Sequence, residues 1–218
     1  MFEIIKQKRK TLSLKVDKDW KIIVKAPKYA TQKEIENFIE KHKDWILKEQ
    51  NKALQNKTIF QIWQKFLFFW ELFELKQSEK KKFYFDKDFF YTSLKIEEEI
   101  RKEFIKFYKK EAYNYISKRI VEFCLLLNID FNKLSINSAK TRWWSCNSNK
   151  NINFSFRLIL APKNSIDYVI IHELAHLTEM NHSRQFWSIV DNYCRQVWLW
   201  DYRQLQKWLK INNLKTNF

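Results

Sequence analysis

The sequence predicts an α+β protein in which a β-rich N-terminal part precedes a helical part with a cluster of histidines. Apolar residues alternate with polar ones in the first part and recur at helical spacing in the second. Three of the four histidines lie in the segment 172–182, which reads HELAHLTEMNH. A change of composition near residue 92 divides the chain into parts 1–91 and 92–218, which we expect to form one continuous structural unit.

The N-terminal part is expected to contain a hairpin, a helix and further strands. Leu12, Leu14 and Val16 alternate with polar residues, and a turn and the segment KIIVKAP, residues 21–27, follow, a pattern typical of a hairpin. Thr31 and Glu34 have the spacing of a capping box, and apolar residues at helical spacing follow them. The segments 59–76 and 83–91 are rich in Phe, Ile and Tyr and are expected to be strands.

The next elements are a long helix and two strands. Apolar residues recur at helical spacing from about 95 to 127. The segment KLSIN, residues 133–137, is expected to be a short strand. In NINFSFRLILAP, the alternation of Ile152, Phe154, Phe156 and Leu158 predicts a second strand with these side chains on one face.

The last part of the chain is expected to be helical. Pro162 ends the second strand, and Asn164 or Ser165 offers an N-cap for the helix that carries the first histidines of the cluster. A further helix is expected to start near Ser183, and a final one near Asp201.

Composition limits the class of protein. The chain has 218 residues, 45% of them hydrophobic, which is enough to bury a core. Its net charge of +16, from 41 basic and 25 acidic residues, favours acidic partners, nucleic acid included. The charge is dispersed along the chain, so an ordinary solvated basic surface is the alternative.

Cysteine usage and hydropathy indicate the compartment. The three cysteines are widely spaced and form no C-x-x-C pair, which favours a reducing compartment over a disulfide framework. Residues 1–10 lack the apolar core of a signal peptide. The apolar stretch after residue 58 is interrupted by polar and charged side chains, so no membrane span is expected. We therefore expect a cytoplasmic protein.

The histidine cluster has the spacing of a metal site. His172 and His176 are four residues apart, so a helix presents both imidazoles on one side. Glu173 lies one step round the helix, where its carboxylate is placed to act as a general base on water rather than as a ligand. The alternative is that H-E-x-x-H arose by chance on an amphipathic helix. The scarcity of histidine elsewhere argues against chance.

His182 is the expected third ligand. It follows His176 by six residues, so the helix must end near 179–181 and the chain must turn back, with Asn181 suited to the turn. If the helix instead continues, Glu179 or Asp191 is the nearest carboxylate for that role. Three neutral imidazoles leave the fourth tetrahedral position of Zn²⁺ open, as in catalytic zinc sites, and we expect one such ion.

Four motifs in order give the chain a resemblance to a known family. They are TRWWSC, NINFSFRLILAP, DYVIIHELAHL and NHSRQFW, and together they resemble the pattern of the YgjP-like metallopeptidases, a branch of the zincin fold. The resemblance covers most of the chain. It implies a zincin-like catalytic part with the H-E-x-x-H helix and an edge strand, zinc ligands at His172, His176 and His182, and a catalytic base at Glu173. It also implies that the strand 152–158 borders the cleft and can hold an extended substrate.

The resemblance suggests a zinc-dependent hydrolase, in the first place a metallopeptidase acting on a peptide or protein. Nucleoside-triphosphate pyrophosphatase activity, also described in this family, is the alternative with a nucleotide substrate. A basic nucleic-acid-associated module is a third. Arg142 and Arg157 are candidates to bind a substrate carboxylate or phosphate, with a surface or fold-stabilising role as the alternative, and Phe154 is a further candidate for substrate contact.

Glycine usage departs from the family pattern throughout. The chain has no glycine and ten tryptophans, whereas about 15 glycines are usual at this length. Trp20, Trp63, Trp70 and Trp144 stand where the family pattern has glycine, at expected turns or bends that favour a positive φ. Our hypothesis is that these letters represent codons, UGA in particular, that the organism reads as glycine.

Overall fold

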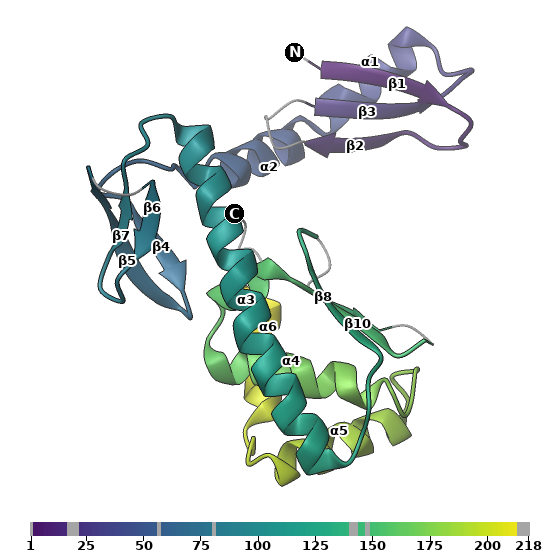
Figure 1. Ribbon diagram of the computed structural model, residues 1–218. Helices are drawn as coiled ribbons and strands as arrows, with labels where there is room; N and C mark the ends of the chain where they lie inside the picture. The colour runs from purple at the N-terminus through teal and green to yellow at the C-terminus, as the bar shows by residue number, and fades with distance from the viewer. Residues whose placement is uncertain are drawn as a thin grey trace. The chain divides into compact units, whose positions relative to one another are not determined.

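The computed structural model divides the chain into two compact units, residues 1–57 and 58–218. Residue 92, where the composition changes, falls inside the second unit. The structure describes residues 2–16, 22–55, 58–79, 82–139, 144–146 and 149–212. The mixed α and β content agrees with the predicted class (Figure 1).

The first unit is a three-stranded sheet with two helices. Its strands are β1 (Phe2–Gln7), β2 (Ser13–Val16) and β3 (Ile22–Pro27), in the order β1-β3-β2. Strands β2 and β3 are antiparallel, which confirms the hairpin, and β1 is parallel to β3. Two helices, α1 (Gln32–Lys41) and α2 (Lys43–Gln55), follow, whereas the apolar spacing through Ile46 predicted one; His42 interrupts it as the C-cap of α1. The buried core consists of Val24, Ala26, Ala30 and Ile35.

The capping box of α1 is confirmed. The Thr31 backbone N–H donates to Glu34 Oε2 over 2.8 Å, and the Glu34 N–H donates to Thr31 Oγ1 over 3.3 Å. These bonds satisfy two donors that a helix start otherwise leaves free. His42, the histidine outside the cluster, is the C-cap of α1, and its Nδ1 lies 2.8 Å from the Phe38 carbonyl oxygen.

The second unit begins with a four-stranded aromatic sheet. Its strands are β4 (Lys65–Phe68), β5 (Glu71–Gln77), β6 (Phe83–Phe85) and β7 (Phe90–Thr92), in the order β4-β5-β7-β6. These strands confirm the prediction for the two Phe-rich segments. Their inward phenylalanines pack on helix α3 (Glu97–Leu127), where the rings of Phe66 and Phe104 are 4.2 Å apart.

Helix α3 confirms the prediction of one long helix. Its buried side chains recur every three or four residues and end at Leu127, which gives one continuous apolar face along the helix. Asn128 ends the helix in the left-handed region at φ 52°, a conformation that Asn tolerates better than most residues. The buried residues of this face are Ile100, Phe104, Tyr108, Ala112, Ile116, Ile120, Phe123 and Leu127.

The second sheet differs from the sequence prediction in one respect. Its strands are β8 (Lys133–Asn137), β9 (Trp144–Cys146) and β10 (Asn151–Ser155), and β10 is central, parallel to β8 and antiparallel to β9. The expected strand 152–158 therefore ends at Ser155 and is not an edge strand. The next residues form a 3₁₀ helix, η1 (Phe156–Leu160), because the Ser155 hydroxyl accepts the Arg157 N–H at its start.

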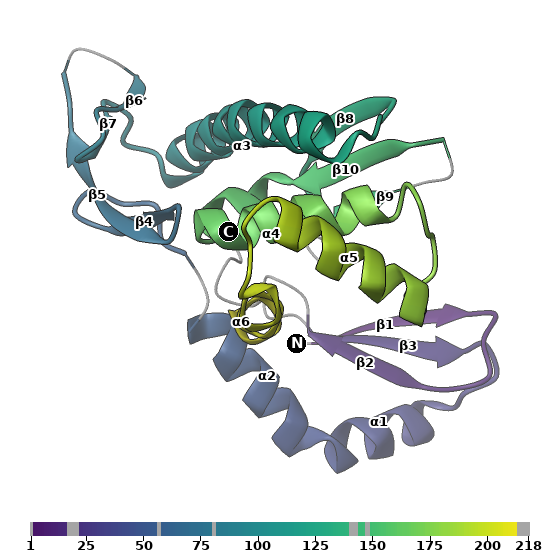
Figure 2. The same cartoon turned by 90° about the horizontal axis from the view of Figure 1, so that it is seen from below.

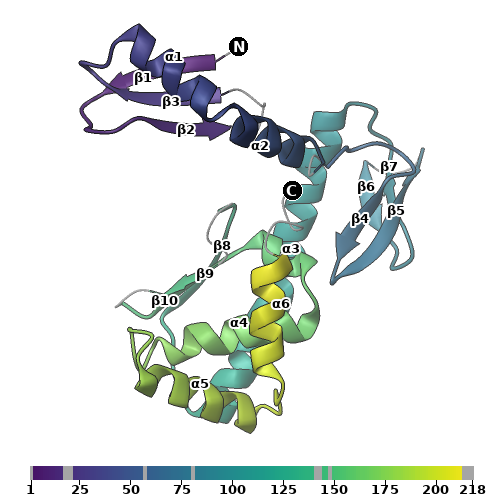
Figure 3. The same ribbon diagram turned by 180° about the vertical axis from the view of Figure 1, so that it is seen from behind.

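Three helices complete the second unit. They are α4 (Lys163–Ala175), α5 (Arg184–Gln196) and α6 (Tyr202–Asn212). Helix α4 packs against α3, α5 and α6 and lies in the middle of this group (Figures 2 and 3). All its residues from Ser165 to Ala175 are buried, which agrees with the absence of a continuous polar face in its sequence.

The ends of two helices test the predicted caps. Ser183 caps α5, as expected, by accepting the Phe186 N–H over 3.2 Å. The expected cap of α4 at Asn164 or Ser165 is wrong, since the helix already begins at Lys163. Pro162 holds the cap position without a side-chain hydrogen bond, in a non-helical conformation (φ −56°, ψ 144°) of the kind that N-cap residues usually have.

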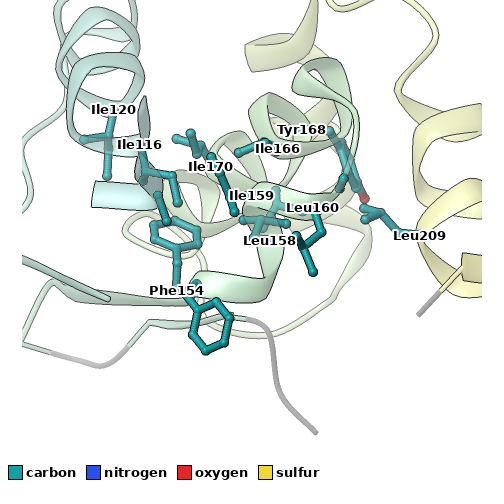
Figure 4. Close-up of a cluster of buried hydrophobic side chains, with 14 of the residues drawn as sticks. Ile116, Ile120, Phe154, Leu158, Ile159, Leu160, Ile166, Tyr168, Ile170 and Leu209 are labelled. Atoms are coloured by element: carbon teal, nitrogen blue, oxygen red, sulfur yellow. The ribbon is translucent and has the colours of Figure 1, made fainter. Parts of the chain in front are cut away.

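The core around α4 collects side chains from distant parts of the chain. Figure 4 shows Ile116 and Ile120 from α3, Phe154 from β10 and Ile166 and Ile170 from α4 in one cluster. All five are fully buried. The cluster fixes α4 against the long helix and the sheet, so the position of the histidine-bearing end of α4 depends on core packing.

A partly buried ion pair also joins α4 to α3. The Arg119 guanidinium donates to both oxygens of Asp167, from Nε over 3.0 Å and from Nη2 over 2.8 Å, and Tyr115 donates to the same carboxylate over 3.1 Å. Glu122 is a second, more exposed partner of Arg119. Asp167 lies five residues before His172, so this pair fixes the helix close to the cluster.

We expect Asp167→Ala to lower the free energy of unfolding by about 1.5 to 3 kcal/mol, the range for hydrogen bonds to charged groups. The loss is smaller than for a fully buried pair because the Arg119 side chain is 29% exposed and can be rehydrated. Urea unfolding measures the change. Glu122→Gln, which alters the exposed partner, is the control. An equal loss of unfolding free energy in both variants would show that the bond to α4 stabilises the fold no more than the exposed pair does.

Among the described residues, three tryptophans adopt the backbone conformation that favours glycine. Trp63 has φ 71°, Trp70 has φ 69° and Trp198 has φ 59°. Trp198 stands just after the C-cap of α5, where the next residue, Leu199, donates its N–H to the Cys194 carbonyl, as in a Schellman motif. Bulky residues at positive φ are strained, and glycine is not.

The positive φ at these positions identifies the codons at which the hypothesis of recoded glycine is best tested. We expect UGA at codons 63, 70 and 198, and sequencing of the gene decides the matter, since UGG at all three positions contradicts it. Trp20 lies outside the described residues. Trp144 is paired with Phe154 in β9, so its backbone gives no independent support for glycine.

Among the helices of the described part, none combines the length and the apolar character that crossing a bilayer requires.

Candidate metal centre

The three clustered histidines lie close enough to share one ion. One ring nitrogen from each of His172, His176 and His182 lies within 4.8 Å of the others. The Nε2 atoms of His172 and His182 are 3.1 Å apart. Two nitrogens on one tetrahedral zinc, each at 2.0 to 2.1 Å, are about 3.3 Å apart. The donor set and its spacing therefore fit a zinc ion.

Helix α4 and the turn after it position these histidines. His172 lies in the last turn of the helix, and His176 is its C-cap with helical backbone angles. The helix ends at Ala175, earlier than the expected 179–181. Because His176 keeps helical φ and ψ, the early end still leaves the first two imidazoles close together, with ring centroids 4.9 Å apart.

The sequence suggested that Asn181 forms the turn to His182 in the left-handed conformation. The structure differs. Asn181 has no positive φ. Its N–H donates instead to Oε1 of Glu179 over 3.0 Å, so the Glu179 side chain bends the chain back. The carbonyl oxygen of Glu179 also accepts from Nδ1 of His176 over 3.1 Å. A carbonyl only accepts, so this bond places the proton on Nδ1 and leaves Nε2 free to bind a metal.

Burial keeps the first two imidazoles neutral. His172 is 8% exposed, and burial, together with the neighbouring His176 and His182, lowers its pKa to about 3. Burial also lowers the pKa of His176. Neutral imidazole is the form that binds a metal, so both residues are ready to act as ligands at neutral pH.

Glu173 is a buried carboxyl group with an oxygen that has no partner. It is 1% exposed, and its Oε2 has no hydrogen bond among the described residues. Burial raises its pKa to about 8. A buried acceptor without a partner is costly, which is expected where a site is shaped for water or an ion rather than for stability.

This pKa predicts a pH dependence of the metal-free protein. A raised pKa means that folding favours the protonated carboxyl group, so its stabilising contribution is complete below about pH 4.3 and is lost as pH rises through 8. We expect the free energy of unfolding of the wild type to fall with rising pH relative to Glu173→Gln. Urea unfolding in the presence of chelator measures this difference. Parallel pH profiles for the two proteins would contradict it.

The two candidate substrate residues that the structure describes are both buried. Phe154 is fully buried in the core of the sheet. Arg157 is 2% exposed and donates from Nη1 to the carbonyl oxygens of Ser138 and Ala139, a fold-stabilising position. Neither side chain offers a surface to a substrate. Arg142 lies outside the described residues.

One residue close to the cluster was not identified from the sequence. The ring of Phe186, in the first turn of α5, lies 4.4 to 4.9 Å from all three imidazole rings, measured between centroids. The available signal was its position in NHSRQF, close after His182 and in the first turn of the helix expected to start near Ser183.

Comparison with known proteins identifies the family. The family model described as "YgjP-like, metallopeptidase domain" matches residues 10–212. Among curated proteins, none matches the chain. One solved structure with similarity is the metallopeptidase zymogen of Pyrococcus abyssi abylysin, at 19% identity and a TM-score of 0.35, over 42% of this chain and 93% of that one. A TM-score of that size does not establish a shared fold. The family match spans nearly the whole chain, which therefore belongs to the YgjP-like metallopeptidases.

Proposed function

We propose that this protein is a zinc-dependent peptidase with a single catalytic ion. His172, His176 and His182 would hold the ion through their ring nitrogens, which lie within 4.8 Å of one another. This spacing, beside a buried carboxyl group with a free oxygen, is the observation that carries the proposal. When bound, the ion supplies Lewis acidity that polarises a carbonyl and acidifies water, and its charge favours the ionised form of Glu173.

Glu173 would move the protons of the reaction. Its carboxylate accepts a proton from the attacking water as the oxygen bonds to the peptide carbonyl carbon. It then gives this proton to the amide nitrogen, and the bond between that nitrogen and the carbonyl carbon breaks. The products are a carboxylate and an amine, so one water is consumed for each bond cleaved. At 1% exposure, the Glu173 side chain has little contact with bulk water.

Strand β9 is the element best placed to hold an extended substrate. It is an edge strand, paired on one side with β10, and it packs against α4. An edge strand offers backbone N–H and C=O groups to an added strand. We therefore assign to residues 144–146 the substrate-holding role that the sequence suggested for residues 152–158.

The test is an assay of the purified protein against a peptide library and, in parallel, against nucleoside triphosphates, with and without chelator. We expect peptide cleavage that chelator abolishes and zinc restores. Hydrolysis of nucleotides without cleavage of any peptide would overturn the proposal. The comparisons give no support for a nucleotide or nucleic-acid partner, so neither is proposed.

A further inference from the structure

Phe186 contacts the whole metal-binding cluster from one side. Its ring lies 4.4 Å from the ring of His176 in a stacked arrangement, with 28° between the planes. It meets His172 and His182 edge to face, with centroids 4.9 and 4.7 Å away and planes at 73° and 86°. The side chain is fully buried. One aromatic ring thus packs against all three imidazoles.

The start of α5 links this ring to the third histidine. Ser183, the N-cap, accepts the N–H of Phe186, so the cap fixes the first turn of the helix. His182 directly precedes the cap. Helices α4 and α5 pack against each other (Figure 2). The ring of Phe186 therefore packs on one side of a cluster formed by the two histidines at the end of α4 and the one that precedes α5.

Contact with the Phe186 ring restricts the orientations that the three imidazole rings can adopt. The imidazole torsion χ2 is broad, so a histidine ring without neighbours samples many orientations of its nitrogens. Freezing three such rings at the moment of binding costs free energy, and a site whose rings are already held binds more tightly. We propose that Phe186 is a positioning residue that holds the three imidazoles in the arrangement that binds the ion. The inference rests on the proposed metal site.

Trp187 is the neighbour with which Phe186 should be compared. Its ring stacks on His182 at 5.8 Å and lies 5.9 Å from His172, and it is only partly buried. It contacts two of the three imidazoles, at longer distances than Phe186. Truncation of Trp187 should therefore affect metal binding less than truncation of Phe186.

The test is the zinc affinity of Phe186→Leu, measured by competition with a chromophoric chelator, together with the visible spectrum of the Co²⁺-substituted protein. We expect affinity to fall about 10- to 100-fold, the range for residues that orient metal ligands, and the cobalt spectrum to change. Val190→Ala is the matched control, because Val190 is fully buried on the same helix about one turn further on. It should lower the thermal midpoint while keeping affinity and spectrum.

Two results would overturn the inference. The first is wild-type affinity and spectrum in a folded Phe186→Leu protein, or in Phe186→Met if the leucine variant does not fold. The second is an equal loss of affinity in Val190→Ala, which would mean that any core damage weakens the site. A wild type that binds zinc but cleaves no peptide would overturn the proposed function and leave this inference standing. A wild type that binds no zinc overturns both.

Discussion

Glu173→Gln is expected to lower the rate of peptide hydrolysis by about 10² to 10⁴ while zinc remains bound. The amide keeps the size of the carboxyl group but cannot accept the proton of water. The group of side chains that can hold the metal consists of three histidines and does not include Glu173. Replacement of Glu173 should therefore leave the ligand set intact. Steady-state kinetics on a cleaved peptide and metal analysis of the same preparation measure the two effects separately.

The control for this variant is Asp191→Asn, which neutralises a carboxylate that pairs with Arg195 on the surface of α5. It should keep near wild-type turnover. Activity of Glu173→Gln within a few-fold of the wild type would assign the proton transfer to another group. Loss of zinc from this variant would instead make Glu173 a ligand, which also contradicts the role proposed here.

His182→Ala is expected to weaken zinc binding strongly and, as a consequence, to abolish activity at ordinary zinc concentrations. The histidine supplies a nitrogen 3.1 Å from that of His172, so its loss leaves two protein ligands where catalytic zinc sites use three. Because His182 is exposed, its removal should cost the fold little. Calorimetric titration of the metal-free protein with zinc measures the affinity.

His42→Ala is the matched control, since His42 is the one histidine outside the cluster. It should bind zinc as the wild type does. Full zinc affinity in His182→Ala would remove the three-histidine site and leave His172 and His176 with an unidentified third ligand. Activity restored to His182→Ala by added zinc would support a ligand role, because the remaining machinery is unchanged.

Much of the local structure could be predicted because it depends on neighbours in sequence. The capping box at Thr31 and the cap at Ser183 act within one helical turn, and both are present. Helix α3 follows from apolar residues at helical spacing. The close approach of His172 and His176 follows in the same way, since the helix geometry alone places residues four apart side by side.

Prediction failed where two structures fit the same local pattern. The alternation from Ile152 to Leu158 suits a strand, yet the chain changes to a 3₁₀ helix after Ser155. Full burial of residues 156–160 removes the alternation between a wet and a dry face that the pattern assumed. The end of α4 and the turn to His182 also depend on side-chain bonds of Glu179 that spacing does not reveal.

The sequence by itself determined the family, the long helix α3 and the residues that can bind a metal, because motif spacing and helical periodicity are properties of short segments. Only the tertiary structure decided that β10 is central, that Phe154 and Arg157 are buried and that Phe186 faces all three histidines. These facts result from packing between segments far apart in the chain. Burial and contact across such distances are set by the core as a whole, and no local pattern contains them.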